Sequence, residues 1–315
     1  MTADVPLPTP PPEPAEARPS LSAEINRATR KHHTELNRLI IERLPLALPP
    51  HATQPDVLGQ GLASFAHIFF AFEQVWKTIE DGQHALSKYD PDKSHEYDVV
   101  GSLAFLRPSG LARSQALRAD LQAIIKRTRQ YVTTRAVGRE LGNRVKAQVD
   151  AKPHLLITYA WVMYMAIFSG GRWIRQQLAQ AGGDFWVGSD IPNWPTLPDN
   201  ELDDSPEVQE EKRSDPPGFS FLYFPESGED GEDIKAEFKS RLAESEALLT
   251  DEERAEVVEA AQGLFDDCIG LVRELDEAVA KQKMSSIILP AVVLTLLLVF
   301  MTGLYLFDKH GYLRG

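Results

Sequence analysis

The sequence predicts an all-α fold, a single multi-helix domain followed by one membrane-spanning helix. Apolar residues recur at helical spacing through most of the chain, and no alternating run of β-branched residues bounded by turns suggests a sheet. Hydrophobic residues make up 43% and charged residues 25% of the 315 residues, as in an ordinary globular protein. Thirteen of the 22 prolines fall in two segments, 1–19 and 183–217, which lie outside the expected helices.

The proposed membrane helix is the uncharged run 287–307, IILPAVVLTLLLVFMTGLYLF. As a helix it would be about 31 Å long, which matches a hydrocarbon core of roughly 30 Å. Lys281 and Lys283 precede it, and only eight residues follow it. We therefore expect a tail-anchored protein whose lipid contact is this segment and whose domain stays in the cytosol.

The domain is expected at 20–283, with Ser20 or Ser22 capping its first helix. Its helices are expected at 20–44, 55–80, 110–131, 135–150, 153–181 and 251–283.

Two segments are not expected to be helical. Residues 1–19 contain seven prolines and almost no large apolar side chain, so we expect a disordered tail. Residues 183–217 contain six prolines, ten acidic and two basic residues, giving a local charge of −8. We expect this insertion to be a solvated, mobile loop, with an acidic docking patch as the alternative.

Charge and cysteine content exclude several classes of protein. The net charge of −13 argues against nucleic acid as a partner. The single cysteine, Cys268, rules out an internal disulfide and a multi-cysteine zinc site. Because Cys268 lies on an apolar stripe, we expect a buried core thiol.

The most informative feature is Ser169-Gly170-Gly171 in the middle of a strong helical segment. Each glycine costs about 1 kcal/mol relative to alanine in a helix interior. Two adjacent glycines favour a bend and let a flat group approach the backbone. Tight helix–helix packing would explain them equally well.

The first helix carries His32 and His33 in the segment Ala28 to Thr34, ATRKHHT. A neutral imidazole on a helix is a common axial ligand of haem iron, although a lone histidine is more often an ordinary core residue.

Together these residues resemble the haem oxygenase family, in its tail-anchored, fungal-like form. The first helix of that family has an Ala-Thr-x-x-x-His-Thr pattern, and its distal helix has a Tyr followed by Leu-Ser-Gly-Gly. Here Tyr164 and Phe168 to Gly171 stand at the second pattern. Residues 65–73, 106–121 and 218–225 are similar to further segments of the family in the same order. The resemblance covers about 20–307 without the insertion.

The resemblance implies an enzyme that binds haem b and opens it with O2 to biliverdin, iron and carbon monoxide. Electrons would come from NADPH through a membrane flavoprotein reductase. It implies His33 as the axial iron ligand, Gly170 and Gly171 against the haem, and Lys235 and Lys239 near its propionates. The implied location is the endoplasmic reticulum membrane, with the outer mitochondrial membrane as the alternative.

Helical periodicity and the resemblance disagree about the ligand. The apolar stripe of the first helix includes His32, whereas the spacing to Ala28 and the following Thr34 favours His33. Asn37, one turn further, stands where the family has a carboxylate that orients the ligand.

The resemblance places Ala166, Ile167 and Ser169 at catalytic positions, and two of them depart from the family. Its members have Gly-Asp where this chain has Ala166-Ile167. In the family the aspartate holds water and delivers protons, which an isoleucine cannot do. Trp161 and Met163 also replace polar residues. We expect Ile167 on the same side as Gly170 and Gly171, with Tyr159 or Tyr164 as substitute polar groups.

The departure leaves a second hypothesis open, a haem sensor, buffer or peroxidase-like protein without oxygenase activity. A third is a tail-anchored helical adaptor without haem, which would use 251–283 to bind a partner.

Overall fold

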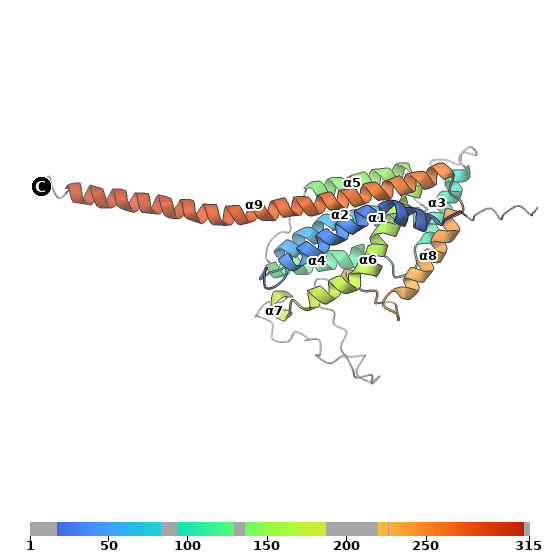
Figure 1. The fold of residues 1–315 in the computed structure, drawn as a ribbon, viewed down its shortest axis with the longest axis horizontal. Helices are drawn as coiled ribbons and strands as arrows, with labels where there is room; N and C mark the ends of the chain where they lie inside the picture. The colour runs from blue at the N-terminus through green and yellow to red at the C-terminus, as the bar shows by residue number, and fades with distance from the viewer. Residues whose placement is uncertain (1–17, 83–93, 129–135, 187–219, 226, 312–315) are drawn as a thin grey trace, which may run out of the picture.

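The computed structural model describes residues 18–82, 94–128, 136–186, 220–225 and 227–311, with backbone alone for 136, 137 and 282–311. Every regular element in these ranges is helical, as the sequence predicts. Figure 1 shows a helical body from which the last helix projects. The α-helices are α1 (Leu21–Arg43), α2 (Asp56–Glu80), α3 (Ser94–Leu106), α4 (Ser114–Thr128), α5 (Ala136–Ala151), α6 (Leu156–Ala179), α7 (Gly183–Trp186), α8 (Glu232–Glu246) and α9 (Asp251–Gly311).

Helix α1 lies parallel to the first half of α9. Its start is capped by the Ser20 side chain, which accepts from the backbone N–H of Ala23. Further along, the Gln262 side chain donates to the Ala28 carbonyl at 3.2 Å. At the far end, Arg43 Nε lies 3.1 Å from Asp276 Oδ2. The matching order of these contacts fixes the register of the two helices.

Helix α2 forms the centre of the body and buries residues on several of its sides. It approaches α5 closely because α5 has glycine at both contact points. A Cβ on Gly138 would lie 2.8 Å from the Ser64 carbonyl oxygen, and one on Gly142 would lie 2.9 Å from that of His67. The buried face of α5 therefore tolerates no larger residue at these two positions without movement of α2.

Several boundaries differ from those predicted. Helix α3 was not expected, although its buried residues Val99, Val100, Leu103 and Leu106 have helical spacing. Arg18 and Pro19, placed in the tail by the sequence, contact α9: Arg18 pairs with Asp251, and the nearly buried Arg254 donates to the Pro19 carbonyl. Residues 1–17 lie outside the described part.

The insertion also begins later than 183, because Gly183–Trp186 forms α7 and buries Phe185 and Trp186. The indole N–H of Trp186 donates to the Leu178 carbonyl at 3.1 Å, which ties this turn to α6. Residues 187–219 lie outside the described part, so the expected acidic loop stays a prediction.

Helix α9 does not end near 283 but continues without a break to Gly311. Its 61 residues give a length of about 90 Å, and Figure 1 shows the later half projecting away from the body. The side chains of the proposed anchor, 287–307, lie outside the described part. Among the residues whose side chains the structure describes, Pro153–Ala179 alone is long and apolar enough to span a membrane, and 78% of its apolar window is buried in the fold, as in a core helix.

Candidate functional site

The two histidines of α1 point in different directions. His32 lies against α9, with its Nε2 3.6 Å from Asp266 Oδ1. His33 is exposed, contacts the Phe265 ring edge-on at 6.0 Å, and makes no hydrogen bond within the described residues. Both histidines thus contact α9, but His32 is partly buried there, whereas the imidazole of His33 is exposed and could reach a ligand. Asn37 is exposed, and in the described part no hydrogen bond joins it to His33.

Helix α1 meets α6 on the side that carries His33. The Trp161 indole N–H donates to Asn26 Oδ1 at 3.3 Å. His33 follows Asn26 by seven residues, so the two lie on the same stripe of α1. The Asn26–Trp161 contact thus brings the His33 side of α1 next to α6, the helix with the Ser-Gly-Gly sequence.

Helix α6 has two distinct sides at this sequence. Ala166 and Ser169 are exposed and Gly170 is partly exposed, and a Cβ on Gly170 would meet no atom within 4 Å. Ile167 and Gly171 are buried together, since Ile167 Cγ2 lies 3.5 Å from where a Cβ on Gly171 would stand.

We expected Ile167 to share one side with both glycines, and the structure places it with Gly171 alone. Gly170 and Gly171, three and four residues after Ile167, are both its neighbours on the helix, but only Gly171 is buried with it, whereas Gly170 is turned further toward solvent. The exposed side consists of Ala166, Ser169 and Gly170, three small groups that would allow a flat molecule to approach the backbone.

Helix α6 bends without breaking. All of 156–179 is α-helical, and Figure 1 shows the two halves of α6 running in different directions. Below the bend, Phe168 stacks on Phe224 with ring centroids 4.7 Å apart. Gly231 has φ +87°, and a Cβ there would lie 2.6 Å from Phe224 Cδ2. The buried side of the bend is therefore closely packed against the segment that leads into α8.

Neither tyrosine of α6 substitutes for the missing aspartate. The Tyr164 hydroxyl is fully buried and donates to Glu73 Oε1 at 2.7 Å, and burial raises its pKa well above the usual range. The Tyr159 hydroxyl donates to Gln148, and burial raises the pKa of this phenol to about 12. Both hydroxyls have partners away from the exposed side of α6, so the polar group expected from them is absent there.

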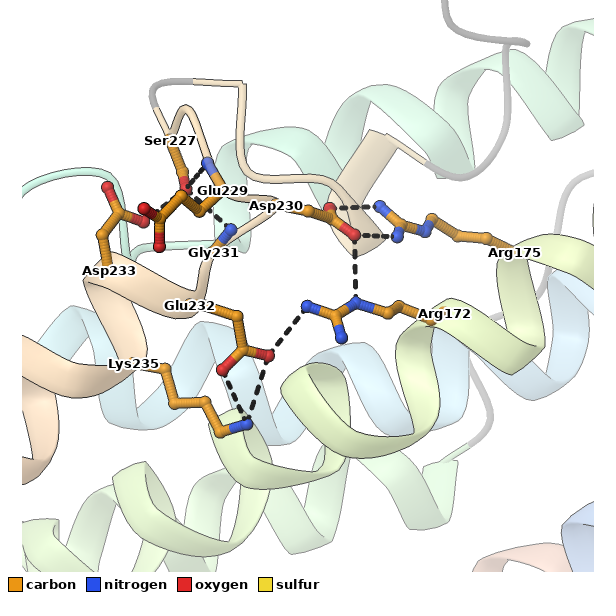
Figure 2. A network of polar contacts seen from close by, with 9 residues as sticks. All are labelled: Arg172, Arg175, Ser227, Glu229, Asp230, Gly231, Glu232, Asp233 and Lys235. Carbon is orange, nitrogen blue, oxygen red and sulfur yellow. Dashed lines mark hydrogen bonds and ion pairs between the residues drawn. The ribbon is translucent and has the colours of Figure 1, made fainter. Parts of the chain in front are cut away.

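Directly after the glycines, α6 carries two arginines that bind the segment before α8 (Figure 2). Arg175 donates to Asp230 Oδ1 at 2.7 Å, and Arg172 Nε donates to Asp230 Oδ2 at 3.1 Å. The hydrogen bond from Arg175 is the main reason that the pKa of Asp230 lies below its usual range. Sequence analysis missed this cluster, although Arg172 and Arg175 are three apart on one helix face.

The same network reaches Lys235 but not Lys239. Glu232 accepts from Arg172 at 2.8 Å and from Lys235 Nζ at 3.1 Å, as Figure 2 shows. Because Arg172 follows Gly171, the Lys235 ammonium is connected to the bend through one carboxylate. Lys239 lies one turn further on α8, is exposed, and has no polar partner in the described ranges.

A second missed group is a buried cluster under the bend. The Glu73 carboxylate accepts from Tyr164 and from the backbone N–H groups of Arg113 and Ser114, at 2.8 and 3.0 Å for the two amides. It thereby caps the start of α4 and fixes α6 against α2. Glu73 is a single acid within a long apolar segment. This isolated charge is the feature of the sequence from which the buried cluster could have been inferred.

The family comparison covers most of the body. The family model described as Heme oxygenase matches residues 19–274. The curated Heme-binding protein HMX1 of Saccharomyces cerevisiae is 23% identical over 272 residues, which are 82% of this chain and 76% of that protein.

Solved structures give the same fold. Haem oxygenase-1 of the cyanobacterium Synechocystis, in complex with haem, matches with TM-score 0.53 and 18% identity, over 85% of this chain and 99% of that one. Haem oxygenase 2 of Chlamydomonas reinhardtii, without haem, matches with TM-score 0.55 and 20% identity, over 81% and 97%. Haem oxygenase-2 of Synechocystis, with haem and NO, matches with TM-score 0.57 and 15% identity, over 84% and 88%. With most of its length matched by the family model and its fold shared with these structures, the chain belongs to the haem oxygenase family.

Proposed function

We propose that the protein binds haem b between α1 and α6 and opens it, with O2, to biliverdin, iron and carbon monoxide. The observation that carries the proposal is the exposed His33 imidazole on α1 together with the small, exposed side of α6 at Ala166, Ser169 and Gly170. Family membership supports the reaction class. Electrons would come from NADPH through a membrane flavoprotein reductase.

The residues present fit a flat macrocycle with one axial ligand. His33 would bind the iron through a ring nitrogen, because neither nitrogen has a hydrogen-bond partner among the described residues. Gly170 would lie against the ring, since no side chain stands between its backbone and open space. The bound haem would supply the redox chemistry and activate O2 at its iron.

The cations of α8 would orient the ring. Lys235 is only partly exposed and already binds a carboxylate, Glu232, so a propionate would compete for the same ammonium. Lys239 lies four residues further on the same face and is available for a second carboxylate. Such exposed pairs contribute up to about 1 kcal/mol each, so we assign them orientation of the ring more than affinity.

The alternative function is haem binding without efficient ring opening, as a sensor, a buffer or a peroxidase-like protein. The buried Ile167 at the position of the family's aspartate favours it, as does the commitment of Tyr159 and Tyr164 to other partners. Heme-binding protein HMX1, the yeast relative, carries haem binding in its name.

We place the protein in the endoplasmic reticulum membrane, with the outer mitochondrial membrane as the alternative. The support is the helical backbone of α9 through the uncharged run 287–307 and its projection from the body (Figure 1). In this arrangement the haem site and the reductase would share one membrane surface.

Titration of the purified full chain with haem tests the site. We expect a histidine-ligated absorption spectrum that His33→Ala abolishes. His32→Ala is the matched control: it alters the neighbouring imidazole, which lies against Asp266, and should leave the spectrum unchanged. Loss of the spectrum in the His32 variant alone would move the ligand to that residue, and a chain that gives no haem spectrum at all would contradict both functions.

A further inference from the structure

The end of the domain where α9 leaves it, called here the exit end, is formed by four helix ends. Arg43, at the end of α1, pairs with Asp276 of α9 at 3.1 Å. A Cβ on Gly61, near the start of α2, would lie 3.1 Å from Leu275 Cδ2. Ala63 of α2 packs on Ile124 near the end of α4, and Gly138 at the start of α5 touches Ser64. All four helix ends therefore lie near residues 275 and 276 of α9.

The connection from α1 to α2 at this end contains no charged residue. It runs from Leu44 to Pro55 as LPLALPPHATQP, and its exposed positions include Pro45, Leu46, Pro49 and Pro50. Leu46 is 55% exposed, and Ile41 just before it is 47% exposed. An uncharged loop with an exposed leucine is not explained by packing within the domain, because these side chains contact solvent instead of the core.

Position along α9 indicates what covers this loop. The run 287–307 begins eleven residues after Asp276, a rise of about 16 Å along a straight helix. The headgroup layer adds several ångströms on that side of the hydrocarbon. A modest tilt of α9 would therefore bring the loop of the exit end to the bilayer surface.

Charge favours the exit end over the opposite end of the body. The exit end presents Lys126 and Arg127 in the last turn of α4 and one acid, Asp56, in the first turn of α2. Its acids Glu42 and Asp276 are paired with arginines, and Glu277 is paired with Lys281. The opposite end also exposes large apolar groups, Phe105 and Leu248. There α9 begins with three acids, of which Asp251 pairs with Arg18 and Glu253 with His95, while Glu252 adds a further negative charge. An anionic membrane surface would attract the first end and repel the second.

We propose that the loop 44–55, with Ile41 and Leu46, docks into the headgroup region of the membrane that holds α9. This inference rests on the proposed membrane anchor and is independent of haem cleavage. Docking would give the body a fixed orientation, with α1 and α6 held at a set height above the bilayer instead of rotating freely on a long helix.

The test uses the full chain in vesicles of phosphatidylcholine and phosphatidylserine. In a Cys268→Ala background, an environment-sensitive fluorophore is attached at Thr53→Cys, an exposed loop position that leaves Leu46 in place. The control label is at Phe105→Cys, 77% exposed at the opposite end. We expect a blue shift and quenching by nitroxide-labelled headgroups at position 53 and neither effect at position 105.

Variants then test the cause of docking. Leu46→Ser should lower the ratio of docked to undocked label about five-fold, since a half-exposed leucine loses its burial in lipid. Leu248→Ser, at the opposite end, is the matched control and should change nothing. Lys126→Glu should lower the same ratio about five-fold or more in phosphatidylserine vesicles.

Equal quenching at positions 53 and 105 would overturn the inference, as would a blue shift at 53 without vesicles, which would mean that a second copy covers the loop. Flotation of the chain with vesicles is measured in the same samples. A chain that does not float would overturn the anchor and the docking together, whereas a floating chain with a solvent-exposed loop would overturn docking alone. Neither outcome changes the proposed haem chemistry.

Discussion

Ile167 stands where the resemblance to the family places an aspartate. Its side chain is only 6% exposed and packs on the buried side of α6 with Gly171. A general acid in this region would have to hold water and pass protons, which an apolar group excludes. Under the proposed function, the chain would bind haem but would lack at Ile167 the polar group that proton delivery requires.

We predict that Ile167→Asp with Ala166→Gly raises bilin yield several-fold, because proton relays account for factors of about 100 or more in rate. The buried carboxylate should lower the free energy of unfolding by about 3 kcal/mol. Bilin absorbance after a single turnover measures the first effect, and urea denaturation measures the second.

The control for this pair is Ile167→Asn with Ala166→Gly. The asparagine side chain has nearly the same shape as aspartate but does not ionise. Equal bilin yields from the two double variants would show that the carboxylate is not the missing element. The wild-type chain would then have another proton path.

Among the helices, α6 is held to the segment that precedes α8 by two kinds of contact. Phe168 of α6 stacks on Phe224, and Gly231 closes against both rings. On the exposed side, Arg172 and Arg175 bind Asp230 at the same junction (Figure 2). Apolar stacking and charge pairing thus fix the segment that carries Lys235.

Replacing Gly231 with alanine should lower the free energy of unfolding by about 2–4 kcal/mol. A left-handed φ of +87° disfavours a side chain, and the new Cβ would lie 2.6 Å from Phe224 and 3.0 Å from Phe168. Gly228→Ala is the control, since its Cβ would meet nothing within 4 Å and should cost less than about 0.5 kcal/mol. Similar denaturation midpoints for the two variants would contradict this account of the junction.

The Arg175–Asp230 pair predicts a dependence of stability on pH. The hydrogen bond from Arg175 lowers the pKa of Asp230 below its usual range. The contribution of the ionised Asp230 to the free energy of unfolding is therefore complete above the pKa that this residue has in the unfolded chain. That contribution is lost as pH falls through the lowered value, below about 4. The pair is partly exposed, so we expect up to about 1 kcal/mol of coupling at pH 7.

A double-mutant cycle of Arg175→Gln and Asp230→Asn measures this coupling by urea denaturation. The interaction energy should be present at pH 7 and much reduced at pH 3. An interaction energy that is the same at both pH values would show that the carboxylate charge is not what stabilises the junction.

Sequence patterns predicted the elements better than their junctions. Long periodic segments such as 20–44 and 55–80 gave α1 and α2 within one residue at each end, because burial against α9 and α5 imposes helical spacing. Helix α3 was missed, since its 13 residues bury only four apolar side chains, too short a pattern to stand out. The cluster around Asp230 joins residues more than 50 positions apart, and no local spacing reveals such a contact.

For the whole molecule, the structure connects a haem oxygenase body to one helix that continues far beyond it. The fold and family were predictable because their signals, the Ser-Gly-Gly within α6 and the histidines of α1, are local in sequence. The choice of His33 over His32 stays a prediction: both contact α9, His32 at Asp266 and His33 at Phe265, and His33 is the more exposed of the two. The sequence alone left the choice open because the apolar stripe of the helix includes His32, whereas the spacing to Ala28 and Thr34 favours His33.

The central claim is that this body opens haem and does so weakly. The most direct measurement is the amount of biliverdin and carbon monoxide formed per bound haem by the full chain, with NADPH and a membrane flavoprotein reductase. We predict equal amounts of both products at low rate, and their loss in His33→Ala. A chain that holds haem through His33 but releases neither product, in the wild type and in the Ile167→Asp, Ala166→Gly variant alike, would contradict the claim and establish a haem-binding protein without oxygenase activity.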